Sequence, residues 1–204
     1  MRRSVLAVLV GAGFLVAAPL ARAGGGIDGT GSVGTCPAAG KISIKPGLVN
    51  GGTTPDVLKV KTKTPKLATC SGGTGDGAHV VSGASKGGGT GDNNDCASLN
   101  GTTPSNLTLV VKWKTDGTVS LNPSTITITT QTGGVAGNRG SFDVSGTVTA
   151  GSFNGHTVTA HIVTDQVLGE ILPLCDGKGL KKISFGSKAS KIDGMMGSGS
   201  VTIN

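Results

Sequence analysis

Residues 141–164, SFDVSGTVTAGSFNGHTVTAHIVT, contain the clearest structural signal in this chain. Apolar and polar side chains alternate through Ser141–Thr149 and again through His156–Thr164, which is the period of a β-strand with one buried face. The connection between the two runs is short and holds two glycines, so the stretch predicts an antiparallel hairpin. Its buried face should comprise six side chains, namely Phe142, Val144, Val148, Val158, Ala160 and Ile162.

Shorter runs with the same alternation recur along the chain, separated by Gly, Pro, Asn and Asp. They cover residues 41–45, 57–64, 78–84, 107–115, 118–121, 125–130, 182–185 and 200–203. Thr, Val, Ile and Ser are frequent in these runs, and such residues favour pleated sheet over helix. The sequence therefore predicts an all-β fold of about 9–10 short strands, either an antiparallel β-sandwich (Ig-like or jelly-roll-like) or a flattened barrel.

One segment has helical spacing instead. Residues 166–174 place Val167, Leu168 and Ile171 on one helical face before Pro173, and Asp165 precedes them as the expected N-cap. We expect at most one short helix there.

The first 23 residues have the pattern of a secretory signal peptide. Arg2 and Arg3 precede an apolar stretch that is short for a membrane span, and Ala21-Arg22-Ala23 forms an A-x-A cleavage site. Cleavage is expected between Ala23 and Gly24, and twin-arginine export is the alternative to the general route. The predicted organisation is a signal peptide (1–23), a flexible Gly-rich leader (24–35) and a single β domain (36–204), with no transmembrane anchor and a secreted, periplasmic or extracellular location.

Charge and composition exclude one class of partner. Removal of the signal peptide reduces the 18 basic residues to 15 against 11 acidic ones, so the net charge falls from +7 to +4. Arg139 is then the single arginine, and aromatic residues make up 2% of the chain. Proteins that recognise nucleic acids use arginine forks and aromatic stacking surfaces, so no nucleic-acid partner is expected.

The four cysteines predict two disulfides, because an even number of cysteines in an exported chain is typical of a disulfide framework. Cys70 and Cys96 bracket a Gly-rich segment that resembles a hairpin, which favours Cys70–Cys96 and leaves Cys36–Cys175. Three pairings are possible for four cysteines. A metal site would need clustered Cys and His at ligand spacing, and none is present.

Catalytic motifs are sparse. Residues 83–87, GASKG, match the G-x-S-x-G pattern of a nucleophile elbow around Ser85, but no helix pattern follows. His156 and His161 lie five positions apart on one predicted strand, so they should face opposite sides. Glu170 is the single glutamate, which disfavours paired-carboxylate catalysis.

A repeated GGTGD segment, at 72–76 and 88–92, raises the possibility of calcium. Oxygen-rich loops with Gly can hold Ca²⁺, and the weak candidates are Asp76, Asp92, Asn94 and Asp95. Their spacing fits no established calcium loop, so the simpler expectation is two loops at one end of a hairpin and no cofactor.

Lys59, Lys61 and Lys63 share one face of a predicted strand, and Lys41 and Lys45 are candidates for adjacent positions. Lysines of this kind protect an exposed sheet edge, and the alternative is contact with an anionic envelope polymer or a phospholipid surface.

These features predict an exported, non-enzymatic β domain with a binding or structural role at the cell envelope or outside the cell, whose partner is an envelope polymer or another exported protein. A small secreted hydrolase with a site assembled from dispersed residues is one alternative. Ca²⁺-dependent adhesion is the other.

Overall fold

The computed structural model describes residues 26–66, 68–104 and 106–204. The expected signal peptide and its cleavage site lie outside these residues. Eleven strands, one α-helix and two 3₁₀ turns are present in the described part, which confirms the predicted all-β fold. In chain order they are β1 Gly34–Pro37, β2 Ala39–Leu48, β3 Asp56–Lys63, η1 Gly75–His79, β4 Val80–Gly91, η2 Cys96–Leu99, β5 Gly101–Pro104, β6 Thr108–Thr115, β7 Ser124–Ala136, β8 Arg139–Ala150, β9 Thr157–Val167, α1 Leu168–Asp176, β10 Leu180–Phe185 and β11 Ser198–Ile203.

All strands form a single antiparallel sheet in the order β1-β11-β9-β8-β7-β6-β4-β3-β2-β10, and β5 pairs with the second half of β7. The predicted hairpin is confirmed, with Phe142 opposite Ile162 and Val144 opposite Ala160. The predicted strand at 118–121 is absent, since only Leu121 makes an isolated bridge there. The extra strands are the short β1 and β5, whose sequences lack a clear alternation.

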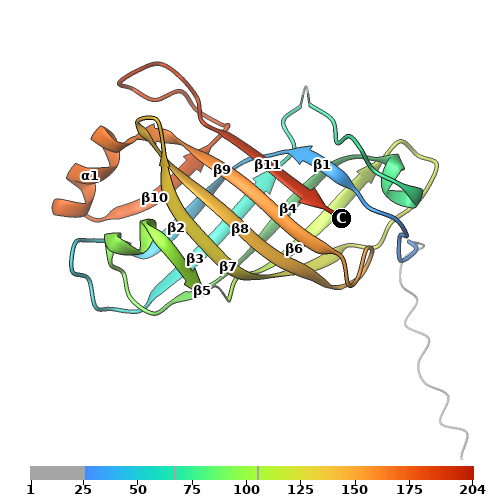
Figure 1. Cartoon of the computed structure of the whole chain (residues 1–204), viewed down its shortest axis with the longest axis horizontal. Helices are drawn as coiled ribbons and strands as arrows, with labels where there is room; N and C mark the ends of the chain where they lie inside the picture. The colour runs from blue at the N-terminus through green and yellow to red at the C-terminus, as the bar shows by residue number, and fades with distance from the viewer. Residues whose placement is uncertain (1–25, 67, 105) are drawn as a thin grey trace, which may run out of the picture.

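The sheet curls into a flattened barrel with two walls (Figure 1). β10, β2, β3, β4 and β6 form one wall, and β7, β8, β9 and β11 form the other. The ladder is not closed, but β1 continues into β2 through Ala38 alone. At the other edge Gln166 of β9 donates to the carbonyl of Lys182 at 3.2 Å and accepts from the N–H of Ser184 at 3.1 Å. A side-chain amide therefore links β9 to β10 where no strand ladder does.

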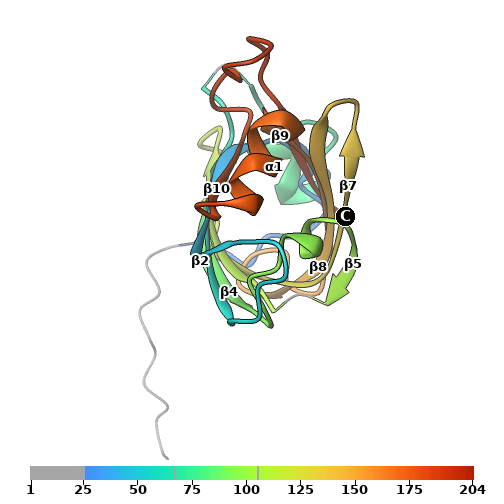
Figure 2. The same cartoon turned by 90° about the vertical axis from the view of Figure 1, so that its left-hand side faces the viewer.

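Each end of the flattened barrel is covered differently. Helix α1 lies across one end (Figure 2) and buries Ile171 and Cys175. At the opposite end Phe153 is 1% exposed and packs edge-on against Trp113, with ring centroids 5.7 Å apart. Phe153 has a positive φ of 64°, an uncommon conformation that turns the β8–β9 connection inward.

Helix α1 begins at Leu168, so Asp165 is not its N-cap. Instead Glu170 accepts a hydrogen bond from the N–H of Val167, and Asp165 is buried where it accepts hydrogen bonds from Ser187, Lys188 and Gly197. The prediction of the cap was wrong because a tertiary contact with the loop after β10 satisfies the Asp165 carboxylate.

Arg139 fastens the same loop. Its side chain is buried. Nη2 donates to both carboxylate oxygens of Asp193 at 2.6 Å and to the carbonyl of Met195, while Nη1 donates to the carbonyl of Thr164. The N–H of Met195, and then the Arg139 guanidinium, lower the pKa of Asp193 below its ordinary value. A buried charge needs such a complete set of partners.

The predicted leader is packed over the part that the structure describes. Thr30 donates its N–H and hydroxyl to Asp76 at 2.8 Å, and Val33 is 1% exposed in the core. Residues 34–37 then pair with β11. Residues 26–35 thus form part of the domain and are not a loose segment in front of it.

Two disulfides form, as predicted, but the predicted pairing was wrong. The bonds are Cys36–Cys70 and Cys96–Cys175. The glycine-rich segment between Cys70 and Cys96 is not a hairpin, because Val80–Gly91 forms one twelve-residue strand. At about 3.3 Å per residue this strand separates its flanking loops far beyond disulfide reach. Cys96–Cys175 instead holds α1 against η2 at the end that α1 covers.

We expect non-reducing peptide mapping to recover this pairing. Trypsin places the four cysteines in different peptides, because lysines or Arg139 separate each neighbouring pair. The peptide that contains Cys70 should be cross-linked to the one that contains Cys36, and the Cys96 peptide to the Cys175 peptide. A Cys70–Cys96 species in the protein, with alkylated thiols excluded, would contradict the strand topology described above.

Candidate functional site

The interior of the flattened barrel contains a cavity of about 420 Å³. Inward-facing side chains of both walls line it, and most of them are aliphatic. Six of these side chains face the interior and yet are only partly buried: Ile42, Leu58, Leu109, Val144, Ala160 and Ile162. Their residual exposure is exposure to the cavity, so the walls do not close against each other.

The cavity follows from composition. Val, Ile, Leu and Ala dominate the inward positions, and the chain has no Tyr, one Trp and four Phe. Aliphatic side chains are too short to meet across the middle of a large flattened barrel, whereas aromatic rings concentrate at the ends. Apolar cavities of a few hundred Å³ with a few polar groups are typical of small-molecule binding sites.

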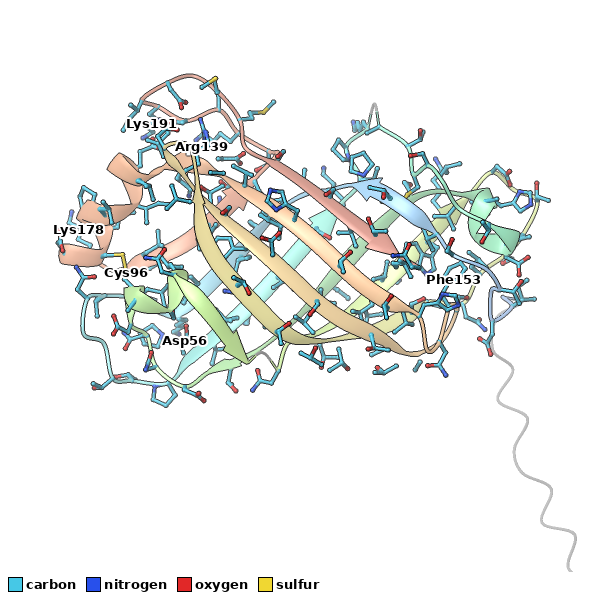
Figure 3. The ribbon with its side chains drawn as sticks, in the orientation of Figure 1. Asp56, Cys96, Arg139, Phe153, Lys178 and Lys191 are labelled. Carbon is cyan, nitrogen blue, oxygen red and sulfur yellow. A yellow bond between two sulfur atoms is a disulfide. The ribbon has the colours of Figure 1, made fainter. Side chains whose placement is uncertain are left out.

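Asp56 is a buried charged group of this cavity, and one oxygen of its carboxylate lacks a partner. It lies on the inward face of β3, near the end of the molecule that holds Cys96 (Figure 3), and is 3% exposed. Its Oδ1 has no hydrogen-bond partner among the described residues. Gly91 lies opposite on β4, where a Cβ would approach that oxygen to 2.1 Å, so glycine leaves room for the carboxylate.

Burial raises the pKa of Asp56 above its ordinary value of 3.8, and the backbone N–H of Gly91 offsets part of this effect. A buried carboxylate with one oxygen that lacks a hydrogen bond is costly, and such groups occur where a ligand or catalytic step uses them. Asp56 is therefore the residue best placed to contact the polar end of a bound molecule.

A second polar spot lies farther along the same cavity. Thr62 and Ser85 face each other across β3 and β4, with their hydroxyl oxygens 2.7 Å apart. Ser85, the predicted candidate nucleophile, thus points into the cavity and shares a hydrogen bond with Thr62. Its strand runs straight through the motif, so the sharp strand-to-helix turn of a nucleophile elbow is not formed.

The structure does not bring a histidine to Ser85. Nδ1 of His79 lies 2.9 Å from Asp116, whose pKa falls to about 2 because of hydrogen bonds from His79 and Thr118. His156 packs edge-on against Phe153. His161 faces outward on β9, with Nδ1 2.6 Å from Asp143 of β8.

The row that contains His161 was missed by sequence reasoning. Asp143, His161 and Ser200 are directly opposite one another on β8, β9 and β11. This is the order acid, base, hydroxyl, and only strand pairing brings it together. His161 and Asp143 are both more than half exposed, and the described residues show no hydrogen bond between His161 and Ser200.

The calcium candidates lie at opposite ends of the molecule. Asp76 precedes β4, where the N–H and hydroxyl of Thr30 lower its pKa, while Asp92, Asn94 and Asp95 follow the end of β4. The expectation of two loops at one end of a hairpin was therefore wrong. Asn94 is buried and bonds to Gly47 and Thr54, and Asp95 caps η2. The described residues contain no cluster of three or more Asp, Glu, His or Cys suited to a metal.

The predicted lysine row extends into a much wider surface, here called the lysine face. It comprises the outward lysines of β2 (Lys41, Lys45), β3 (Lys59, Lys61, Lys63), β4 (Lys86), β6 (Lys112, Lys114) and β10 (Lys182). Edge protection does not explain it, because β3 lies between β2 and β4 and is not an edge strand.

Comparison with known proteins adds no relative. The chain matches no protein-family model, and neither a curated protein nor a solved structure is detectably similar to it. Among the described residues, no helix is both long and apolar enough to cross a membrane.

We expect Asp56→Asn to stabilise the protein at neutral pH. Because the pKa of Asp56 is higher in the folded state than in the unfolded state, its ionised form lowers the free energy of unfolding. This cost vanishes below about pH 3.8, where the carboxyl is protonated in both states. Thermal melts should therefore show a higher midpoint than the parent at pH 7 and an equal one at pH 3.

Asp92→Asn is the matched control, since Asp92 lines the same cavity as Asp56 but is exposed. Its midpoint should follow that of the parent at both pH values. A lower midpoint for Asp56→Asn at pH 7 would mean that Asp56 is held by favourable contacts and is not an uncompensated charge.

Proposed function

We propose that this protein is an exported, non-enzymatic binding protein that holds a small, largely apolar molecule inside its flattened barrel. The observation that carries the proposal is the cavity of about 420 Å³ between two walls of partly exposed aliphatic side chains. Apolar surface of this kind is covered either by water, at a cost, or by an apolar occupant.

The chemistry of the lining supports an elongated molecule with one polar end. Aliphatic residues occupy the middle of the cavity, whereas Asp56 lies near the end that holds Cys96. A hydroxyl or amine on the occupant would supply the hydrogen bond that Oδ1 of Asp56 lacks. The apolar remainder would then extend past Leu58 and Val144 toward Trp113.

The disulfides support a role outside the cytoplasm, since such bonds persist in oxidising compartments. They also fit a binding protein mechanically. Cys96–Cys175 holds α1 over one end of the flattened barrel, and Phe153 fills the other.

The test uses N-phenyl-1-naphthylamine, an uncharged apolar fluorophore that brightens in apolar surroundings. We expect saturable binding at one site per protein. Val144→Phe should weaken binding by about tenfold or more, because the added ring occupies the cavity. Val135→Phe is the control, since Val135 is 56% exposed near the end of β7 and does not line the cavity, so this change should leave binding unchanged.

Equal binding by the two variants, each shown to be folded by its circular dichroism spectrum, would refute a cavity site. Organic extraction of the protein purified from its native host, followed by mass spectrometry, would identify a resident molecule directly.

A second candidate function, a secreted hydrolase, is favoured by the row Asp143, His161 and Ser200. A histidine oriented by a carboxylate beside a serine is the arrangement that activates a nucleophile. However, the backbone of β9 is paired on both sides, so few N–H groups remain to stabilise an oxyanion.

If the hydrolase alternative is correct, a fluorophosphonate probe should label Ser200 in the parent, and labelling should fall at least tenfold in His161→Ala. The Ser85→Ala variant should be labelled like the parent. The proposed binding function predicts that no serine is labelled above the level of the heat-denatured protein.

A further inference from the structure

The lysine face is a field of positive charge without compensating acids. On the outward positions of β2, β3, β4, β6 and β10, the described residues include nine lysines and no Asp or Glu. The ion pairs of the described part involve His79, Arg139 and His161, so none of these lysines has a carboxylate partner. Residues 24–204 carry a net charge of only +4, so nine lysines without acids concentrate positive charge on one wall.

The arrangement works against the stability of the fold. Lys41, Lys61 and Lys86 are directly opposite one another on β2, β3 and β4. Like charges in directly opposite positions of an antiparallel sheet repel each other. Threonine or serine would fit these exposed positions without repulsion, as on the other wall, where Thr127, Thr147 and Thr157 occupy the corresponding outward row. A partner with negative charge would turn this repulsion into attraction.

We propose that the lysine face docks this protein onto an anionic phospholipid surface. The lysines are spread in two dimensions over five adjacent strands, a width of about 19 Å at the usual strand spacing. A planar array of headgroups can engage all of them together, whereas a single linear polymer would follow one row. Lysine is a compact point charge that needs no bidentate geometry, which suits mobile headgroups.

The shape and composition of this wall agree with a planar partner. A hollow around Asp143 and His161 lies on the opposite, Thr-rich wall and not on the lysine face. Val57 and Val110 are 46% and 38% exposed among the lysines and can contact the interfacial region. Docking would also bring the cavity beside a source of apolar molecules. Only this consequence rests on the proposed function; the docking itself does not.

The experiment is co-sedimentation of the purified protein with two kinds of vesicle, one of phosphatidylcholine alone and one that also contains phosphatidylglycerol. We expect binding to the anionic vesicles only, and a loss of about tenfold or more between 50 and 500 mM salt, since surface charge is screened over a few Å at high salt. The variant Lys41→Gln/Lys61→Gln/Lys86→Gln should lose binding to a similar degree.

The matched control is Lys178→Gln/Lys188→Gln/Lys191→Gln, which removes the same charge from exposed lysines outside the face. It should bind anionic vesicles like the parent. Equal losses in both triple variants would show that net charge alone acts, and equal binding to neutral vesicles would also overturn the proposal. Preference for soluble dextran sulfate, with no binding to anionic vesicles, would assign the face to a polymer instead.

The same variants separate this inference from the proposed function. Both triple variants alter only exposed side chains, so N-phenyl-1-naphthylamine binding should equal that of the parent. Vesicle binding with no fluorophore binding would refute the cavity function and leave docking intact. Fluorophore binding with no vesicle binding would refute docking and leave the cavity function intact.

Discussion

Two-residue alternation along a continuous antiparallel ladder is the constraint on which this structure depends. Most inward positions must be apolar for the walls to form, and in this chain those positions are filled mainly by Val, Ile and Leu. Side chains of that length cover the inner surface of each wall without filling the space between the walls. The cavity, the position of Asp56 and the segregation of lysines to the outer surface all follow from the same alternation.

Glycine allows neighbouring strands of one wall to approach each other where a side chain would interfere. In β4, a Cβ at Gly87 would come within 1.9 Å of the carbonyl of Thr108, and one at Gly88 within 2.0 Å of the carbonyl of Leu58. These glycines therefore sit inside a strand because neighbouring backbones pass close to them. In the sequence the same run resembles a turn, and this resemblance misdirected the prediction of a hairpin between Cys70 and Cys96 and of the disulfide that would close it.

Arg139 and Asp56 are both buried charged residues, but they differ in how completely their charges are compensated. Arg139 has Asp193 and several carbonyls around it, so its charge is compensated and it fixes the loop after β10. Asp56 has an oxygen with no partner, in the wall of an apolar cavity. The contrast separates a structural role from a binding role, because evolution of a stable fold alone would pair or remove the second charge.

The sequence by itself determined the local features: strands at 41–45, 141–149 and 156–164, the hairpin between the last two, a short helix near 166–174 and four paired cysteines. These depend on short-range periodicity and residue type, which are readable along the chain. Tertiary structure alone decided which cysteines pair, where Asp165 finds its partners, and that Lys41, Lys61 and Lys86 adjoin one another. It also decided that Asp143, His161 and Ser200 align and that the core is hollow. Those outcomes depend on which strands lie side by side and on how far apart the walls stand, and period-two alternation is equally compatible with many such arrangements.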